Sequence, residues 1–372
     1  MATLVIHTDR ILKNIKKINR YLNKHNIEWT LVTKVLSGNK AVLEKLLQHP
    51  IIKSSRSDGN VHSIGDSRIS NLRRIKKIAA SDVTTMYIKP PPIKLARAIV
   101  ESADISLNTS LETIKALNEE AKLQNKIHQI IIMIELGELR EGIVTDKIID
   151  VYDKIFHLSN IKLIGLGANL GCMYGVEPTY DKLVQLCLYK YLLEAKFGRR
   201  IPLVSGGSSI TLPLIGRKKI PKGINHLRIG EAAFLGTSPL NNRRFRELST
   251  NAFRFYGNII ELEKKQPIPE GNITEANIGH VAPIKEKQGA RETYRAIVDF
   301  GILDVDIDNL EPIDKEVRFV GITSDMAVYD LGDNRTRSNK PKYKIGDMLC
   351  MKPNYMAVAR LMASRFIEKV VY

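Results

Sequence analysis

The first two thirds of the chain alternate short apolar, β-branched runs with longer helix-like segments, and this rhythm constrains the fold most. The runs are Trp29–Thr33, Ile52–Ser55, Val83–Ile88, Asp104–Leu107, Ile130–Glu135, Lys162–Gly167, Pro202–Val204 and His226–Ile229. Strands that alternate with helices favour parallel pairing, and about eight such strands close a (β/α)8 barrel. We therefore predict an α/β fold with a TIM-type barrel over residues 8–240.

The rhythm changes after Leu240. The later strand-like runs are Phe253–Lys264, Tyr294–Phe300, Arg318–Ile322, Ala327–Leu331 and Asp347–Lys352, with Gly, Pro, Asn and Asp in the segments between them. Such runs predict a C-terminal all-β domain over residues 241–372. The opening run Thr3–His7 precedes the first barrel strand, so we expect residues 1–7 to pair with the β domain.

Composition narrows the setting. Hydrophobic residues make up 44% and charged residues 26% of the chain, as in an ordinary globular protein. No apolar run approaches the roughly 18 residues that cross a bilayer, and the N-terminus does not resemble a signal peptide, so we expect no membrane partner. The cysteines Cys172, Cys187 and Cys350 have no metal-ligand spacing, which favours a reduced, cytoplasmic setting without a metal.

The net charge of +17 raises the question of a nucleic-acid partner. The densest basic clusters lie at Arg73–Lys77, Arg217–Lys219 and Arg243–Arg246, and aromatic residues do not interleave them in a ladder. Because the basic residues are spread along the chain, solvated helix faces explain most of the charge. We predict no nucleic-acid partner.

Polar and glycine-rich segments collect at the carboxyl ends of the predicted strands, where barrel active sites lie. These segments are Lys34, Asp58–Gly59, Glu135–Gly142, Ala168–Gly175, Ser205–Ser209 and Arg228–Glu231. A lysine at this rim supplies an amine that can form a Schiff base with an aldehyde cofactor. Lys34 is therefore the first catalytic candidate.

The segment Ser205–Ser209 reads SGGSS and follows the seventh predicted strand. Its glycines allow close backbone approach, and its N–H groups and hydroxyls can hold a phosphate, which barrels often bind after strands seven and eight. A flexible turn is the simpler interpretation of SGGSS alone. Together with Lys34, it predicts pyridoxal 5'-phosphate as the cofactor.

Motifs across nearly the whole chain resemble the alanine racemase family, the fold type III pyridoxal-phosphate enzymes, and most closely its ornithine/lysine racemase branch. The stretches that carry the resemblance include VTKVLSGN, IELGELREGI, LGANL, VSGGSSITLPL, GINHLRIGEAAFLG and KIGDMLCMKPNYMAV. The family implies a barrel, a C-terminal β domain and a head-to-tail homodimer in which each β domain completes the partner's site.

The resemblance also implies roles for single residues. Lys34 falls on the Schiff-base lysine, and Arg140 falls on the arginine that contacts the cofactor's phenolic oxygen. Arg228 falls on the arginine that faces the pyridine nitrogen, and Asn169 takes the place of a histidine beside the ring. The remaining matches, at the phosphate site, are Ser208 or Ser209, Gly230 and Tyr355.

One departure from the family concerns the second acid–base group, a tyrosine of the partner's β domain. Ile302 stands at its place in this sequence. A two-base racemase needs a proton-transfer group on each face of the α-carbon. The candidates, left unranked, are Tyr174, Cys172, Asp304 and Asp325.

A cationic substrate side chain needs a carboxylate partner, so the acidic residues of the rim are candidates for substrate binding. Glu138 is the leading candidate for the ammonium group of ornithine or lysine, with Asp325 as a second substrate contact; a structural pair between Glu138 and Arg140 is the alternative. We predict a racemase of a basic amino acid. A lyase or decarboxylase on the same fold, or a non-enzymatic carrier of the cofactor, are the alternative functions.

Overall fold

The computed structural model describes residues 1–53, 59, 61–79, 82–273, 279–283 and 291–372. The chain forms two compact units. One unit comprises Thr8–Thr250, and the other combines Met1–His7 with Asn251–Tyr372. In the described residues, no helix is long and apolar enough to cross a membrane.

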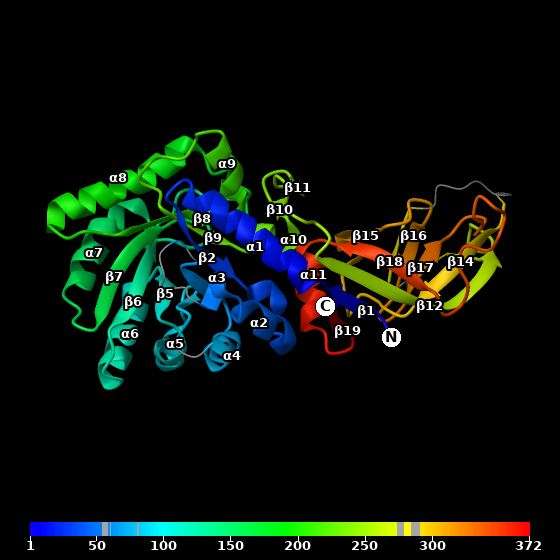
Figure 1. Ribbon diagram of the computed structural model, residues 1–372, viewed down its shortest axis with the longest axis horizontal. Helices are drawn as coiled ribbons and strands as arrows, with labels where there is room; N and C mark the ends of the chain where they lie inside the picture. Colours follow the sequence, from blue (N-terminus) through cyan, green and yellow to red (C-terminus); the bar gives the residue numbers. More distant parts are fainter. Residues whose placement is uncertain (54–58, 60, 80–81, 274–278, 284–290) are drawn as a thin grey trace. The chain divides into compact units, whose positions relative to one another are not determined.

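The first unit is a closed barrel of eight parallel strands, as predicted (Figure 1). The strands in barrel order are β2 (Glu28–Val32), β3 (Ser63–Asp66), β4 (Thr85–Tyr87), β5 (Ile105–Asn108), β6 (His128–Met133), β7 (Ile161–Gly167), β8 (Leu203–Ser208) and β9 (His226–Ile229). Strand β9 pairs with β2 and closes the ring. The carboxyl ends of β8, β9 and β2 are therefore neighbours at one rim.

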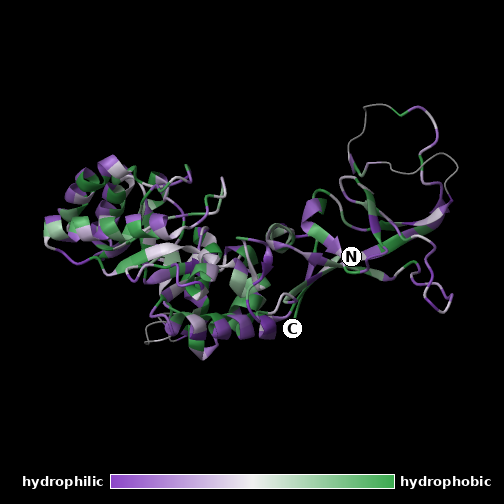
Figure 2. Ribbon diagram, turned by 90° about the horizontal axis from the view of Figure 1, so that it is seen from above, coloured by the Kyte–Doolittle hydropathy of each residue, from purple (hydrophilic) through white to green (hydrophobic). Residues whose placement is uncertain are grey.

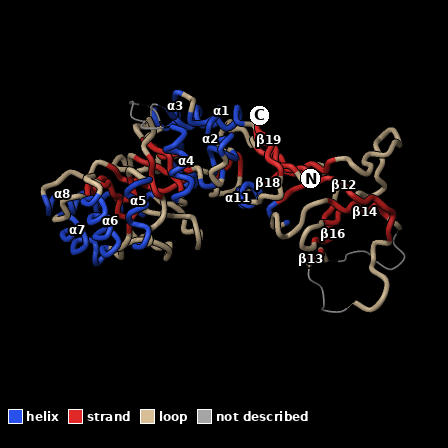
Figure 3. The backbone as a smooth tube through the Cα atoms, turned by 90° about the horizontal axis from the view of Figure 1, so that it is seen from below, coloured by secondary structure: helices blue, strands red, loops and turns tan. Residues whose placement is uncertain are grey.

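Helices surround these strands (Figure 3). They are α1 (Thr8–Asn23), α2 (Lys40–Leu47), α3 (Pro50–Lys53), α4 (Ile69–Ala79), α5 (Ala96–Ser102), α6 (Leu111–Leu123), α7 (Ile148–Phe156), α8 (Tyr180–Phe197), α9 (Leu212–Gly216) and α10 (Glu231–Leu235). Helix α8 shows how local sequence sets the bounds: the Thr179 side chain accepts a hydrogen bond from the N–H of Lys182, and Gly198 ends the helix in the left-handed region at φ +64°.

The second barrel strand differs from the sequence prediction. Ile52 and Lys53 lie in the short helix α3, and Ser54–Ser55 are outside the described residues. The strand is Ser63–Asp66, so Gly59 precedes it instead of following it; Asp58 is also outside the described residues. The prediction was wrong because Pro50 begins a helical turn that buries Ile52, whereas the true strand reads SIGD and has little β-forming character.

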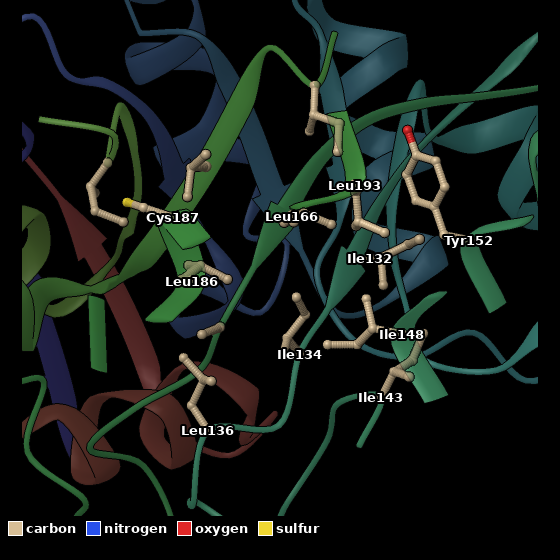
Figure 4. Packing of buried hydrophobic residues seen from close by; sticks show 14 of the residues in the cluster. Ile132, Ile134, Leu136, Ile143, Ile148, Tyr152, Leu166, Leu186, Cys187 and Leu193 are labelled. Atoms are coloured by element: carbon tan, nitrogen blue, oxygen red, sulfur yellow. The ribbon is translucent and has the colours of Figure 1, made fainter. Parts of the chain in front are cut away.

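Successive side chains of each barrel strand point alternately outward and inward, which gives the barrel an outer core and an inner core. Outward side chains pack against the helices in a large apolar cluster that includes Ile132, Ile134, Leu166 and Leu186 (Figure 4). Inside the barrel, one side is apolar, with Met86, Leu107 and Met133 among its residues. Around β2, β8 and β9 the interior is instead polar, because Thr30, Ser205 and His226 hydrogen-bond there. Figure 2 shows the alternation of apolar and polar residues along the chain.

The second unit is predominantly antiparallel. Its sheet contains β1 (Thr3–Ile6), β12 (Phe253–Lys265), β13 (His280–Val281), β14 (Thr293–Val298), β15 (Leu310–Pro312), β16 (Arg318–Ile322), β17 (Ala327–Asp330), β18 (Met348–Pro353) and β19 (Glu368–Val371), with helix α11 (Tyr355–Ala363) beside them. Strand β1 pairs antiparallel with β12 and parallel with β19. The all-β character predicted for this region is confirmed by the sheet.

Residues 241–250, which the sequence analysis grouped with the β domain, cluster with the barrel unit. Strands β10 (Thr237–Ser238) and β11 (Arg243–Arg244) form a small hairpin there. The Asn14 side chain holds the end of this segment, because its amide donates to the Ser249 carbonyl at 2.9 Å and accepts from the Ser249 N–H at 2.7 Å.

Candidate functional site

Lys34 lies directly after β2 and begins a single 3-10 turn, Lys34–Leu36. Its side chain is exposed, whereas its neighbours Thr33 and Val35 are buried. The strand before it carries Thr30, whose hydroxyl lies 3.0 Å from His226 Nε2 inside the barrel. Its position directly after β2 puts Lys34 at the carboxyl-end rim of the barrel.

Arg228 of β9 is 6% exposed, and its guanidinium is held at two points. Nη1 donates to Ser205 Oγ at 2.5 Å, and Nη2 donates to the Ala168 carbonyl at 2.9 Å. Burial lowers the pKa of Arg228 to about 10, although the charge of Glu141 opposes that effect. The side chain is therefore still a cation at neutral pH, fixed by the ends of two other strands.

A buried hydrogen-bonded chain continues from Ser205. Its hydroxyl lies 2.9 Å from His226 Nδ1, the other ring nitrogen faces Thr30 Oγ1, and that hydroxyl lies 2.7 Å from Ser63 Oγ. Because Arg228 can only donate, the Ser205 oxygen accepts from it and the Ser205 proton remains available for Nδ1. Burial lowers the pKa of His226 well below its usual value, which favours the neutral ring.

The loop after β6 is organised by acidic side chains. Glu135 accepts hydrogen bonds from the N–H groups of Gly137, Leu139 and Arg140 at 2.6, 3.0 and 3.2 Å. The Arg140 guanidinium forms an ion pair with Glu141 and contacts the Cys172 sulfur in the loop after β7. The structure thus places Arg140 at the same rim as Lys34 and Arg228.

Glu141 links this loop to Asn169. Its Oε1 accepts a hydrogen bond from Arg140 at 2.9 Å and another from Asn169 Nδ2 at 3.3 Å. The negative charge of Glu141 also opposes the effect of burial on the pKa of Arg228, so the Glu141 carboxylate lies close to that guanidinium. From the sequence, Glu141 and Ser205 were placed in the rim segments without a role of their own, and His226 was not a candidate. His226 lies two residues before Arg228 on β9, so both side chains point to the same face of the strand. This spacing could have identified His226 from the sequence.

Glu138 requires a correction. The sequence analysis assigned it to a substrate ammonium group, yet it is 2% exposed and its carboxylate accepts six backbone hydrogen bonds from residues 171–176. A carboxylate has roughly four lone-pair sites, so these donors saturate it. The alternative pairing with Arg140 is also not what the structure shows, because that guanidinium engages Glu141 and Cys172.

The predicted phosphate loop lies at the ends of β8 and β9. Gly207 adopts φ +116°, which favours glycine, and a side chain at Gly230 would approach the Val32 carbonyl of β2 to 3.2 Å. Ser208 is half-buried at the rim, while the buried Ser209 hydroxyl accepts the N–H of Ala232 at 3.1 Å. Ser208 is thus the more accessible of the two hydroxyls.

The remaining candidates differ in exposure. Tyr174 is 69% exposed on the loop after β7. In the β unit, Asp304 accepts hydrogen bonds from the Gly301 N–H and the Ser364 hydroxyl, whereas Asp325 is exposed on the turn between β16 and β17. Tyr355 is half-buried at the start of α11.

Ile302 lies beside that same turn, because its N–H donates to the Thr323 carbonyl at 3.0 Å. The next residue, Leu303, donates to the Ser324 carbonyl at 3.0 Å. The position of the family tyrosine and Asp325 therefore belong to one corner of the β unit.

A cavity of about 550 Å³ lies elsewhere on the barrel unit and is lined by Lys16, Asn19, Arg20, Asn23, Lys24 and Ile51. Most of these residues come from the C-terminal half of α1, the helix that leads into β2. Because that helix runs against the strand that follows it, this end lies at the amino ends of the barrel strands, away from Lys34.

The chain is thus a β/α-barrel protein with a lysine and a glycine–serine loop at the carboxyl ends of its strands. Comparison with known proteins gives the family: the alanine racemase N-terminal domain model matches residues 6–239. The chain belongs to the alanine racemase family, as the motifs indicated.

Two relatives match over nearly their full lengths. The chain is 33% identical to ornithine racemase of Acetoanaerobium sticklandii, over 98% of this chain and 98% of the relative. It is 31% identical to lysine racemase of Thermotoga maritima, over 99% and 97% respectively. The prediction of an amino-acid racemase, and of the ornithine/lysine branch, is confirmed by these similarities.

Solved structures share the fold. Alanine racemase of Clostridium difficile 630 aligns with a TM-score of 0.70 at 16% identity, covering 100% of this chain and 95% of that one. Alanine racemase of Bartonella henselae, solved with covalently bound pyridoxal phosphate, aligns with a TM-score of 0.68 at 14% identity, covering 100% and 99%. D-threonine aldolase of Filomicrobium marinum aligns with a TM-score of 0.70 at 12% identity, covering 100% and 91%.

Proposed function

We propose that the protein is a pyridoxal-phosphate-dependent racemase that interconverts the L and D forms of a basic amino acid such as ornithine or lysine. The full-length similarity to ornithine and lysine racemases carries this proposal. The residues at the barrel mouth support it, because they offer the functional groups that such a reaction requires.

The residues fit the cofactor by their chemistry. Lys34 supplies an exposed amine after β2, and the β8 loop offers the half-buried Ser208 hydroxyl beside Gly207, whose φ of +116° favours glycine. Gly230 extends that donor set on the adjacent strand, and the family resemblance would add the Tyr355 hydroxyl to the phosphate site. When bound, the cofactor supplies an aldehyde for the amino group and withdraws electrons from the α-carbon.

Lys34 would hold the cofactor and move the α-proton at its Nζ on one face of the substrate. Arg228 would face the ring nitrogen. A guanidinium does not give up its proton at neutral pH, so it would keep that nitrogen unprotonated. Electron withdrawal would then be modest, which favours rapid return of the proton over transfer of the amino group. Arg140 would contact the cofactor's phenolic oxygen, and Asn169 would lie beside the ring.

The second face needs its own proton-transfer group, since Ile302 cannot act as one. Tyr174 is our first candidate because its hydroxyl group lies on an exposed loop at the barrel rim. Cys172 of the same loop is the alternative. Asp304 is less suited, because both carboxylate oxygens accept hydrogen bonds within the β unit.

We propose a head-to-tail homodimer in which the partner's β unit completes each site. Asp325 would then be the carboxylate that receives the substrate's side-chain ammonium group, since it is exposed and lies at the corner that carries Ile302. The three free thiols, Cys172, Cys187 and Cys350, agree with a reducing, cytoplasmic setting.

The decisive experiment incubates the purified protein, reconstituted with pyridoxal phosphate, with L-ornithine in deuterium oxide. Loss of the α-proton signal together with appearance of the D form on chiral analysis supports the proposal. Release of carbon dioxide would identify a decarboxylase, cleavage of the carbon skeleton would identify a lyase, and an unchanged spectrum across basic and neutral amino acids would identify a carrier.

The Asp325→Asn variant tests the substrate assignment. We expect a higher KM for ornithine and lysine with little change for neutral amino acids that the wild type accepts. Asp333→Asn, at another exposed carboxylate of the β unit, is the control. Equal losses for basic and neutral substrates would remove Asp325 from the substrate site.

A further inference from the structure

The loop of residues 171–176, which follows β7, combines exposed side chains with a fixed backbone. Met173 is 57% and Tyr174 is 69% exposed, and Cys172 is also exposed. Segments with such exposure ordinarily exchange their amide protons readily. Here, however, six consecutive N–H groups are directed at one carboxylate.

That carboxylate is Glu138, which belongs to the loop after β6. Its Oε1 accepts from the N–H groups of Cys172, Met173, Tyr174 and Gly175 at 3.0, 2.5, 2.8 and 3.2 Å. Its Oε2 accepts from the flanking residues, Gly171 at 3.0 Å and Val176 at 3.1 Å. The whole loop is thus wound around one buried negative group.

Two glycines make this winding possible. Gly171 and Gly175 adopt φ values of +62° and +75°, in the left-handed region where glycine is favoured. Successive N–H groups in such a loop form a concave anion-binding nest. An anion usually comes from a ligand, but in this chain Glu138 supplies it internally.

The loop also touches the catalytic candidates. Cys172 contacts the Arg140 guanidinium, and Arg140 is paired with Glu141, which in turn holds Asn169. The loops after β6 and β7 are therefore joined in three ways: through Glu138 and the backbone, through Arg140 and Cys172, and through Glu141 and Asn169. Loosening the first connection would release the second.

We infer that Glu138 is a positioning residue that fixes the 171–176 loop, so that Cys172 stays against Arg140 and Tyr174 is presented at the barrel mouth. Its role differs from binding a substrate ammonium group, because its oxygen atoms are already occupied by backbone donors. The structural part of this inference stands on the loop geometry alone; its kinetic consequence rests on the proposed function.

Hydrogen–deuterium exchange of the full-length protein tests the structural part without any activity measurement. In the wild type we expect the amides of 171–176 to exchange at least about tenfold more slowly than an unstructured peptide. Glu138→Gln should accelerate their exchange at least about tenfold, because the amide directs donors toward N–H groups. Glu177→Gln, an exposed carboxylate directly after the loop, is the matched control and should leave exchange unchanged.

Two exchange results would overturn the inference. One is unprotected 171–176 amides in the wild type, a measurement that does not require any variant to fold. The other is identical exchange of these amides in the wild type and in a folded Glu138→Gln protein.

Steady-state kinetics separate positioning from substrate binding. We expect Glu138→Gln to lower kcat about tenfold or more for every amino acid that the wild type accepts, with KM changed less. A rise in KM restricted to basic amino acids would instead restore Glu138 as a substrate carboxylate and overturn the inference. If no amino acid is racemised by the wild type, the proposed function fails while the exchange result still decides the role of Glu138.

Discussion

Ser205 and Arg228 are joined across neighbouring barrel strands by a hydrogen bond of 2.5 Å from Nη1 to Oγ. The same Ser205 hydroxyl lies 2.9 Å from His226, so the serine connects the guanidinium to a buried neutral imidazole. Arg228 is thereby held by the Ser205 side chain in addition to the Ala168 carbonyl. The orientation of the guanidinium depends on this support.

Ser205→Ala should weaken catalysis without unfolding the protein. The substitution removes one of the two acceptors that hold Arg228, and a hydrogen bond to a charged group contributes about 1.5–3 kcal/mol. We expect a loss in kcat of about tenfold, with near-normal circular dichroism. Unchanged kcat with pyridoxal phosphate bound would show that the serine does not orient Arg228.

Lys34→Ala should abolish racemisation and the cofactor absorbance near roughly 420 nm that a lysine-bound aldehyde gives. We expect a rate loss of at least about a thousandfold, since a positioned acid–base group contributes about 10²–10⁴-fold. Lys40→Ala is the control, because Lys40 is exposed at the start of α2 and forms an ion pair with Glu44. Full turnover by the Lys34 variant would exclude the lysine from the chemistry.

Glu138 should make the stability of the protein depend on pH. Burial raises the pKa of Glu138, but the N–H donors of Cys172, Tyr174 and Met173 outweigh that effect and hold the pKa below its usual value. The stabilising contribution is therefore present above the ordinary glutamate pKa of about 4.5 and is lost as the pH falls through the folded-state value.

Urea unfolding of the wild type and Glu138→Gln measures this dependence. At pH 7 we expect the variant to be less stable by about 1.5–3 kcal/mol. The difference should shrink as the pH is lowered below about 4.5. A difference that stays constant from pH 7 to pH 3 would contradict the assigned protonation behaviour.

Substitution by alanine should destabilise the protein to different extents at two glycines of the rim loops. At Gly142, φ is +152° and an added Cβ would lie 2.3 Å from the Glu135 nitrogen, whereas at Gly175, φ is +75° and nothing lies within 4 Å. We expect Gly142→Ala to cost more than about 3 kcal/mol of unfolding free energy and Gly175→Ala about 1 kcal/mol. Comparable thermal melting of both variants would argue against the tight packing at Gly142.

Sequence periodicity predicted most of the barrel because each strand had to be apolar enough for burial. It failed at the second strand, where SIGD carries few β-branched residues and the apolar pair Ile51–Ile52 next to Pro50 forms part of a helix. Of the candidate site, the positions of Lys34 after the first strand and Arg228 in the last strand could be predicted from the strand pattern and the family motifs, while their roles stay predictions. Strand parity then explains why His226 and Arg228 of β9 both reach Ser205 inside the barrel.

The amino-acid sequence by itself determined the barrel, the β-rich second unit, the family and the place of Lys34 at the first strand's end, because these depend on local pattern and on motifs. Only the tertiary structure decided what Glu138 does. Its six donors lie 33–38 residues away in the chain, and they converge because Gly171 and Gly175 bend the loop after β7. A carboxylate beside an active site attracts cations and N–H groups alike, so composition could not distinguish a substrate contact from a loop anchor.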